Sequence, residues 1–85
     1  MAYAVEITPA AKRQIRKLER PVQERIVRRL DVLAEDPRPP GVEKLEGDQT
    51  IYRVRVGEYR IIYEIRDKVL VVLVLKVGHR REVYR

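Results

Sequence analysis

Hydrophobic residues recur with two different periods along the 85-residue chain, and the change of period separates extended from helical segments. Residues 3–7 are apolar at every second position, which is the period of a half-buried strand. The Thr8-Pro9 pair that follows is typical of a helix start, because threonine caps the first turn and proline at the first helical position loses no hydrogen bond. A strand that leads directly into a helix is therefore predicted.

Two amphipathic helices are predicted between residues 9 and 36, where apolar residues follow one another at intervals of three and four positions. The first helix shows this spacing at Ala11, Ile15 and Leu18, and the second shows it at Val22, Ile26, Leu30 and Leu33. Pro21 disfavours helical backbone at the residue before it, so a break is expected at Arg20. The second helix should end before Asp36-Pro37. The pattern predicts a helical hairpin.

Residues 36–50 contain three prolines and two glycines and are predicted to form a loop. After it, residues 51–56 alternate, residues 59–66 return, and residues 69–77 are almost wholly apolar. A strand that is apolar on both faces belongs in the middle of a sheet or beneath a partner. The predicted fold is α+β in the order β-α-α-β-β-β, with the helical hairpin packed on one face of a small antiparallel sheet. Residues 1–85 are expected to form a single domain.

The turn between the second and third predicted strands brings the residues of a candidate site together. Gly57-Glu58 fits a two-residue type II′ turn, which pairs Arg55 directly with Arg60 and puts Arg53 on the same face, opposite the apolar face. Like charges in directly opposed positions are unfavourable by about 0.2–1 kcal/mol, and the planar donor fork of arginine suits phosphate oxygens. The face is therefore interpreted as a phosphate site. The alternative is that these side chains extend into solvent, toward Glu58 or Glu64.

The C-terminal residues supply a second basic cluster. Gly78 permits a sharp exit from the last strand, and the residues after it combine basic side chains with one tyrosine. The candidate functional residues in this segment are His79, Arg80, Arg81, Tyr84 and Arg85. A soluble, frayed terminus is the alternative interpretation, and for His79 a solvent-exposed strand-end position.

The net charge and the residue composition limit the classes of partner and cofactor that the protein is expected to bind. The net charge of +6 favours polyanions, nucleic acid first and an acidic protein second, although a charged surface also serves solubility alone. The chain has no cysteine and one histidine, which argues against a disulfide scaffold or a zinc site, and no metal or cofactor is expected. The sequence lacks an apolar run of about 20 residues and a signal-peptide pattern. We therefore expect a soluble cytoplasmic protein that does not bind membranes.

An ordered set of motifs resembles the RelE/ParE superfamily of toxins from toxin–antitoxin pairs, over nearly the whole chain. After the opening strand and the helical hairpin, the matching pieces are Glu35-Asp36-Pro37-Arg38, Lys44-Leu45 and the segments 52–56, 57–63 and 77–84. The likeness is greatest to the RelE-like mRNA interferases. It implies a toxin that cleaves mRNA on the ribosome without a metal ion, through attack of the 2′-hydroxyl on the adjacent phosphorus.

The resemblance also implies roles for particular residues. The positions that match the family's functional side chains are Arg53, Arg55, Arg60, Arg80 and Tyr84. Arg60 and Arg80 would stabilise the charge that develops on the phosphorus, and Tyr84 would stack on a base and orient or deprotonate the 2′-hydroxyl. His79, Arg81 and Arg85 would add RNA contacts. The implied partners are a cognate antitoxin of acidic, RelB-like type, the ribosome and mRNA.

Two features depart from the family pattern. Arg53 and Arg55 stand where lysine is frequent, and arginine stays protonated, so the base would be Tyr84, His79 or a ribosomal group. The chain also ends one residue after Tyr84, without a long terminal helix. Two other functions stay open: a ParE-like inhibitor of DNA gyrase, and a non-catalytic domain that binds nucleic acid by charge.

Overall fold

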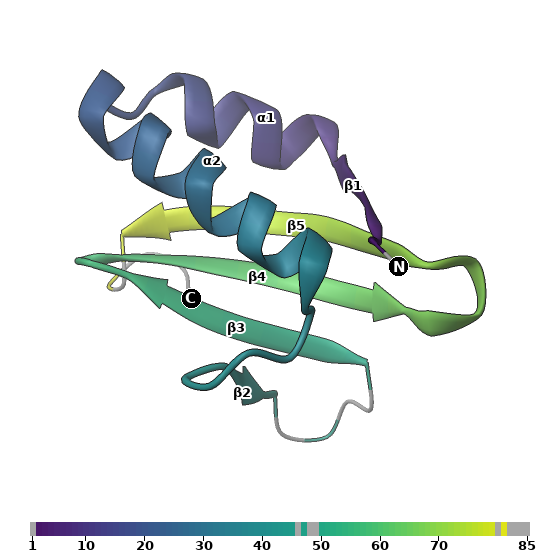
Figure 1. Cartoon of the computed structure of the whole chain (residues 1–85). Coiled ribbons are helices and arrows are strands. Elements are labelled where there is room, and N and C mark those ends of the chain that lie inside the picture. The colour runs from purple at the N-terminus through teal and green to yellow at the C-terminus, as the bar shows by residue number, and fades with distance from the viewer. Residues whose placement is uncertain (1, 46, 48–49, 80, 82–85) are drawn as a thin grey trace.

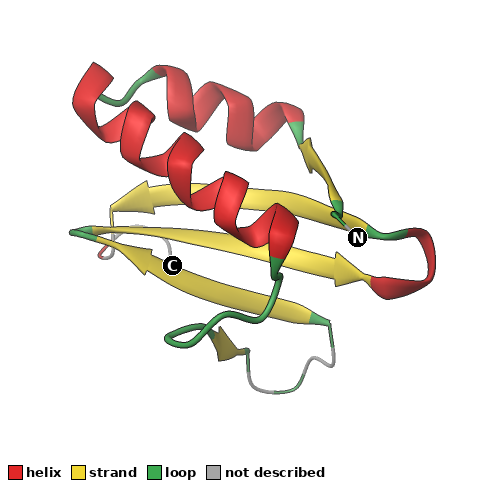
Figure 2. Ribbon diagram, in the orientation of Figure 1, coloured by secondary structure: helices red, strands yellow, loops and turns green. Residues whose placement is uncertain are grey.

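Two helices lie across one face of a five-stranded sheet in the computed structural model, which describes residues 2–45, 47, 50–79 and 81 (Figures 1 and 2). Along the chain the elements are β1 (Ala4–Ile7), α1 (Pro9–Arg16), α2 (Arg20–Glu35), β2 (Glu43–Lys44), β3 (Ile51–Val56), β4 (Tyr59–Arg66), the 3₁₀ turn η1 (Asp67–Val69) and β5 (Val71–His79). The predicted α+β class and helical hairpin are confirmed. No helix within these residues is both long enough and apolar enough to cross a bilayer.

The strands are arranged in the order β1-β5-β4-β3-β2, so the nearly all-apolar β5 is an interior strand between β1 and β4, in agreement with the prediction that it lies inside the sheet. The strand starts at Val71 rather than at Val69, because Val69 belongs to η1 and Leu70 takes a left-handed conformation with φ of 55°. The meander β3-β4-β5 is antiparallel. β1 adds to it in parallel with β5, which makes the whole sheet mixed. Side-chain period alone carries no information about strand direction.

Local contacts explain the two helices. Thr8 Oγ1 accepts a hydrogen bond from the Ala11 N–H at 3.2 Å, which caps α1 as predicted. The helices separate at residues 17–19, slightly earlier than expected, and Pro21 lies in the first turn of α2. Gln23 Nε2 donates to the carbonyl oxygens of Ile15 at 2.9 Å and Leu18 at 3.1 Å. These bonds satisfy carbonyl groups that the end of α1 leaves without helical partners.

The core fills the space between the helices and the sheet. Its largest fully buried side chains are Ile26 and Leu33 from α2 and Ile61, Tyr63, Ile65, Val72, Val74 and Val77 from the sheet. The Tyr52 and Tyr63 rings stack with their centroids 6.0 Å apart. The pairs Tyr52/Tyr63, Val54/Ile61 and Val56/Tyr59 of β3 and β4 thus face the helices, as predicted. The opposite face of the sheet, called the open face below, carries the polar residues of the same strands.

The β3–β4 hairpin has the predicted register. Val56 pairs with Tyr59, Arg55 with Arg60, and Arg53 with Ile62. Gly57 has a φ of +60°, whereas Glu58 has a negative φ, which is the combination that a type II′ turn requires. The predicted loop over residues 36–50 contains the short strand β2, which pairs with Tyr52 and Arg53 at the edge of the sheet. Two residues are too few for periodicity to indicate a strand.

Candidate functional site

Basic residues of three neighbouring strands meet on the open face, close to the end where β3 and β4 join. Two adjacent cross-strand rows contain them, Arg55–Arg60–Gly78 and Arg53–Ile62–Lys76. Neighbouring strands lie about 4.8 Å apart, so the four cationic side chains arise from a patch roughly 10 Å wide. The structure therefore brings together Arg53, Arg55 and Arg60, as the sequence predicted, and adds Lys76. These four residues are called the open-face cluster.

Acidic residues lie beside part of the cluster. Arg53 Nη2 is 2.7 Å from Glu43 Oε2, and Arg55 Nη2 is 4.0 Å from Glu58 Oε1. Arg55 Nε also donates to the Gly57 carbonyl oxygen at 2.9 Å. The alternative orientation toward Glu58 thus holds for Arg55, whose side chain is 57% exposed. An ion pair this exposed contributes little to stability.

Glu64 lies on the same face but belongs to another pair. Its Oε1 is 2.8 Å from Nε of Arg66, at the far end of β4. Among the described residues, the four cations of the open-face cluster therefore face two nearby carboxylates, Glu43 and Glu58. Arg53 and Arg60 are only partly exposed, and partial desolvation strengthens the interaction of a guanidinium with an anion. The excess of positive charge fits a phosphate or phosphodiester ligand.

Lys76 was missed in the sequence because the register of the last strand could not be fixed. A bulge in the β4–β5 pairing falls between Ile62 and Tyr63, and it decides which residue of β5 lies beside Ile62. One signal was present. Lys76 is the only charged residue in the apolar run of residues 69–77, and a charge in a central strand needs a polar surface or a ligand.

The residues after Gly78 were predicted to form a second basic cluster. His79 pairs with Tyr59 and turns its ring toward the helix side, 5.7 Å from the Tyr59 ring and at 77° to it. It therefore does not join the open-face cluster. The Arg81 N–H donates to His79 Nδ1 at 3.3 Å, and the Arg81 side chain is exposed. Arg80, Tyr84 and Arg85 lie outside the described residues, so their predicted roles stay predictions.

A second charged cluster lies at the opposite end of the sheet. Arg38 contacts the Asp67 carboxylate through two nitrogens, at 2.8 and 3.2 Å, and the Tyr3 hydroxyl donates to the same carboxylate at 2.6 Å. Hydrogen bonds from Arg38 and Tyr3 lower the pKa of Asp67 to about 2. Arg38 Nε also donates to the Tyr52 hydroxyl at 3.1 Å. These contacts join the chain start, the segment after α2 and η1, which indicates a structural role.

The described part of the chain contains no candidate metal-binding site. No group of three or more His, Asp or Glu side chains within residues 2–45, 47, 50–79 and 81 is arranged to hold a metal ion. The open-face cluster supplies guanidinium and ammonium groups, which bind anions and stabilise negative charge.

The chain matches the model of a known family over residues 5–84, described as the ParE toxin of the type II toxin–antitoxin system parDE. It is also 34% identical to the mRNA interferase toxin RelE of Escherichia coli, in an alignment that covers 99% of this chain and 92% of the relative. The chain belongs to the RelE/ParE toxin superfamily. Toxin RelG of Mycobacterium tuberculosis is 30% identical, with 100% and 99% of the two chains covered.

Solved structures support the same RelE-like assignment. RelE in the archaeal RelE–RelB complex of Pyrococcus horikoshii superimposes with a TM-score of 0.85 at 32% identity, over 96% of this chain and 99% of the other. The isolated RelE toxin of E. coli gives 0.83 at 33% identity, over 98% and 92%. The resemblance stated from sequence motifs is thus confirmed. In this RelE-like toxin, Arg53, Arg55 and Arg60, three of the five positions that match the family's functional side chains, belong to the open-face cluster.

Proposed function

We propose that this protein is the toxin of a toxin–antitoxin pair and that it blocks translation by cleaving mRNA on the ribosome. The observation that carries the proposal is the open-face cluster: Arg53, Arg55, Arg60 and Lys76 converge on a solvent-facing patch of a RelE-like fold. The relatives named mRNA interferase toxin RelE and toxin RelG support the activity. The cluster suits a polyanion with closely spaced phosphates.

The proposed reaction is an internal transesterification. The 2′-hydroxyl oxygen attacks the adjacent phosphorus, the bond from phosphorus to the 5′-oxygen breaks, and the products are a 2′,3′-cyclic phosphate and a 5′-hydroxyl. The proton of the 2′-hydroxyl passes to a base, and the leaving 5′-oxygen takes up a proton. Negative charge grows on the phosphate oxygens in the transition state, and fixed cations stabilise it.

The basic side chains of the site have different roles in this reaction. Arg60, from the row nearest the turn, stabilises the developing charge together with Arg80, while Arg53, Arg55 and Lys76 hold the phosphates. Arginine does not give up its proton at neutral pH, so none of these arginines is the base. His79 packs against Tyr59 on the helix side, which favours Tyr84 or a ribosomal group as the base.

We propose an antitoxin as the second partner. The relatives from P. horikoshii and E. coli were crystallised as complexes of RelE with RelB, which supports a cognate RelB-like protein for this chain. The net charge of +6 favours an acidic binding segment in that protein. With ribosomes and mRNA as its target, the toxin would act in the cytoplasm.

Primer extension tests this function. Messenger RNA is taken from cells induced to express the wild-type chain, Arg60→Ala or Tyr84→Ala, and the 5′ ends are mapped. The proposal predicts discrete cuts within translated codons for the wild type, none in an untranslated control RNA, and strong loss of cutting in both variants. Cuts that persist in both variants would contradict the assigned site.

A gyrase inhibitor is the second candidate, because the matching family model is that of a ParE toxin. That function requires protein binding rather than phosphate chemistry. Inhibition of supercoiling by purified gyrase, with intact mRNA in cells whose growth is arrested, would support it and would overturn the nuclease proposal.

A further inference from the structure

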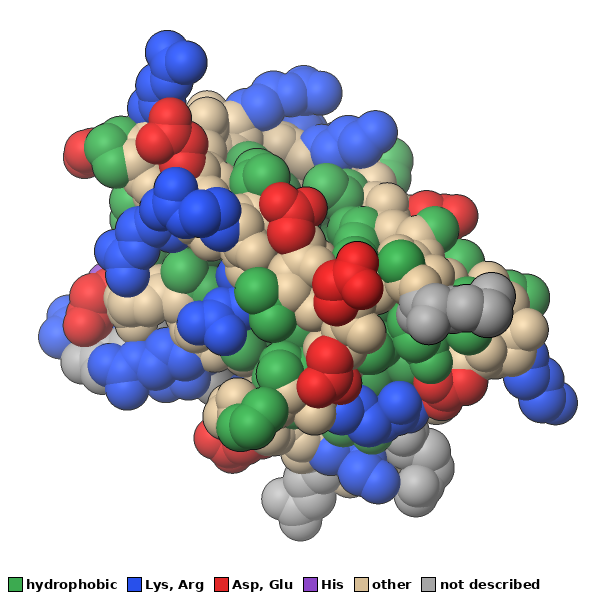
Figure 3. Space-filling model, in the orientation of Figure 1, with side chains coloured by type: hydrophobic (Ala, Val, Ile, Leu, Met, Phe, Trp, Pro, Cys, Tyr) green, Lys and Arg blue, Asp and Glu red, His purple; other side chains and the backbone are tan. Residues whose placement is uncertain are grey.

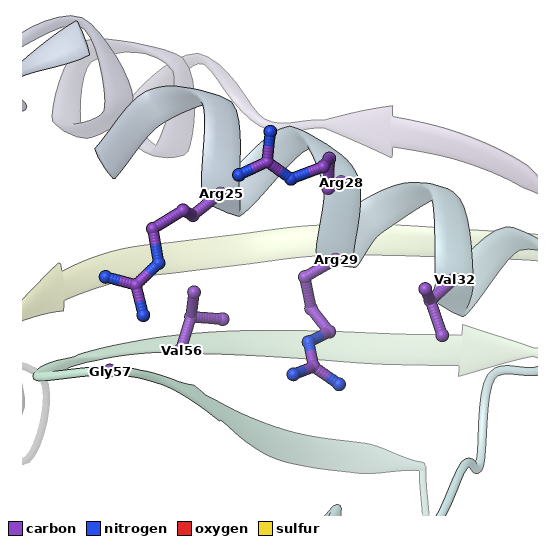
Figure 4. A pocket seen from close by; sticks show the side chains of 6 residues that line it. All are labelled: Arg25, Arg28, Arg29, Val32, Val56 and Gly57. Atoms are coloured by element: carbon purple, nitrogen blue, oxygen red, sulfur yellow. The ribbon is translucent and has the colours of Figure 1, made fainter. Parts of the chain in front are cut away.

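Three arginines of α2 surround a hollow on the other side of the β3–β4 turn. Arg25, Arg28 and Arg29 line it, and its volume is about 350 Å³. Val32, Val56 and Gly57 complete the lining. Arg25 and Arg29 extend from the helix toward the strands, and Arg28 lies across the helix (Figure 4). These arginines are called the α2 cluster, and Lys and Arg side chains gather at this end of the molecule (Figure 3).

The α2 cluster is not neutralised within the described residues. The ion pair that α2 makes there joins Arg20 Nε to Glu24 Oε2 at 3.6 Å. Glu24 directly precedes Arg25 and lies one turn before Arg28, but none of the three arginines has a hydrogen bond or ion pair with a described residue. Like charges three and four residues apart on a helix are destabilising. An anion in the hollow would remove this repulsion.

Gly57 connects the α2 cluster to the open-face cluster. An ideal Cβ at this glycine would lie 2.8 Å from Arg25 Nη2 and 3.2 Å from Nη1, so the Arg25 guanidinium rests directly on the turn. Arg55 Nε donates to the carbonyl oxygen of the same glycine at 2.9 Å. Guanidinium groups of both clusters thus contact one residue. Positive charge continues around the turn from the open face to α2.

We propose that the α2 cluster is a second phosphate subsite, which binds the RNA backbone beyond the segment that is cleaved. The inference rests on the proposed function and extends it. Guanidinium forks match phosphate oxygens, and the exposed Val32 gives the hollow an apolar surface against which a ribose can lie. Continuity with the open-face cluster favours RNA over an acidic polypeptide, because a single strand that passes around Gly57 contacts both clusters.

The test compares two variants of equal charge. One carries Arg25→Gln, Arg28→Gln and Arg29→Gln, and its control carries Arg13→Gln, Arg16→Gln and Lys17→Gln on the exposed side of α1. Each variant loses three positive charges. The probe is a fluorescein-labelled RNA with 2′-O-methyl groups, which 2′-hydroxyl attack cannot cleave. Fluorescence anisotropy measures its Kd over a range of salt concentrations, once as a single strand and once as a folded hairpin.

The proposal predicts that the α2 variant binds RNA at least tenfold more weakly than the α1 control at low salt. The slope of log affinity against log salt should fall by about 0.7 for each lost contact with a single-stranded phosphate. A larger effect on the single strand identifies the mRNA itself as the source of the phosphate, and a larger effect on the hairpin identifies structured RNA. Either result supports the subsite.

Three results would overturn the inference. Equal losses in the two variants would mean that net charge alone sets the affinity. Unchanged RNA binding with weaker antitoxin binding would make the α2 cluster a protein-binding surface. A third variant carries Arg25→Lys, Arg28→Lys and Arg29→Lys. If both this variant and the glutamine variant bind RNA as tightly as the wild type, the α2 cluster does not contact the RNA.

The two proposals fail separately. If the wild-type chain cuts no RNA but the α2 variant still loses affinity for the uncleavable probe, the nuclease function is wrong and the subsite stands. If the wild type cuts RNA and the α2 variant binds and cuts it equally well, the subsite is wrong and the nuclease function stands. Circular dichroism and thermal melting of each variant verify that it is folded, as the exposed positions of Arg25 and Arg28 lead us to expect.

Discussion

The two ends of the sheet both carry arginines, but among the described residues they differ in the number of cations for each nearby carboxylate. At the η1 end, Arg38 forms a two-pronged ion pair with Asp67, and Tyr3 and Tyr52 complete the network. At the turn end, the open-face and α2 clusters together hold seven cations (Arg53, Arg55, Arg60, Lys76, Arg25, Arg28 and Arg29), with Glu43 and Glu58 as the nearby acids among the described residues.

We infer from this difference that the charged residues at the η1 end stabilise the fold, whereas those at the turn end bind a ligand. The Arg38–Asp67 pair joins segments that are distant in sequence, so its removal should change stability. The clusters at the turn end hold seven cations near two described acids, so their removal should change RNA binding and cleavage instead. The following substitutions test this separation, starting with the largest expected effect.

Arg60→Ala should lower the single-turnover rate of RNA cleavage by about 100-fold, in the range found when one donor to a transition-state oxyanion is removed. Its matched control is Arg66→Ala, which removes an arginine from the same face of the same strand but from a pair with Glu64. The control should cleave at the wild-type rate. Equal losses in the two variants would contradict the assignment of Arg60.

Tyr63→Phe should lower the free energy of unfolding by about 1–2 kcal/mol and leave the cleavage rate unchanged. The buried Tyr63 hydroxyl donates to the Pro37 carbonyl oxygen at 2.7 Å, and burial raises the pKa of this phenol. Phenylalanine keeps the packing but leaves that oxygen without its donor. Urea titration measures the change. A loss of cleavage by a variant of unchanged stability would be the opposite result.

Lys76→Gln should reduce cleavage efficiency by about tenfold, which corresponds to one charge-assisted contact of roughly 1.4 kcal/mol. The neighbouring Arg53 and Ile62 should keep their positions, because Lys76 is partly exposed and its strand is held by backbone pairing. Lys76→Arg retains the charge and should restore most of the efficiency. If Lys76→Gln cleaves normally, the cluster consists of arginines alone.

Asp67→Asn should remove an acid-dependent part of the stability. The pKa of Asp67 is lowered from 3.8 to about 2, first by its hydrogen bond with Arg38 and then by that with Tyr3. A carboxylate with a lowered pKa in the folded state stabilises the protein above pH 3.8, and this contribution disappears as the pH falls toward 2. The Tm difference between wild type and variant should thus be largest near neutral pH and small near pH 2. A constant difference would contradict this view of the pair.

Strong periodicity and turn chemistry made much of the fold predictable. The Gly57-Glu58 turn is sufficient to fix the β3–β4 register, which places Arg55 opposite Arg60. The parallel pairing of β1 with β5 and the short strand β2 were not predictable, because they depend on contacts between distant segments. The position of Lys76 beside Ile62 was not predictable either, because a bulge in the β4–β5 pairing determines it.

The α2 cluster was the harder feature to foresee. In sequence, Arg25, Arg28 and Arg29 are the polar residues of an amphipathic helix, and such residues usually face water. Their proximity to the turn follows from the packing of α2 over β3, which brings Arg25 against Gly57. Side chains from separate elements form a site only when tertiary packing joins them, and helical spacing does not report this.

The chemical ends of the cut RNA reveal whether the open-face cluster promotes attack of the 2′-hydroxyl. RNA that is cut by the purified toxin on programmed ribosomes is analysed by mass spectrometry, with Arg60→Ala and Arg66→Ala in parallel. The account predicts 2′,3′-cyclic phosphate and 5′-hydroxyl ends from the wild type and from Arg66→Ala, and about 100-fold fewer from Arg60→Ala in the same time. Fragments with 5′-phosphate and 3′-hydroxyl ends, or equal yields from the two variants, would contradict it.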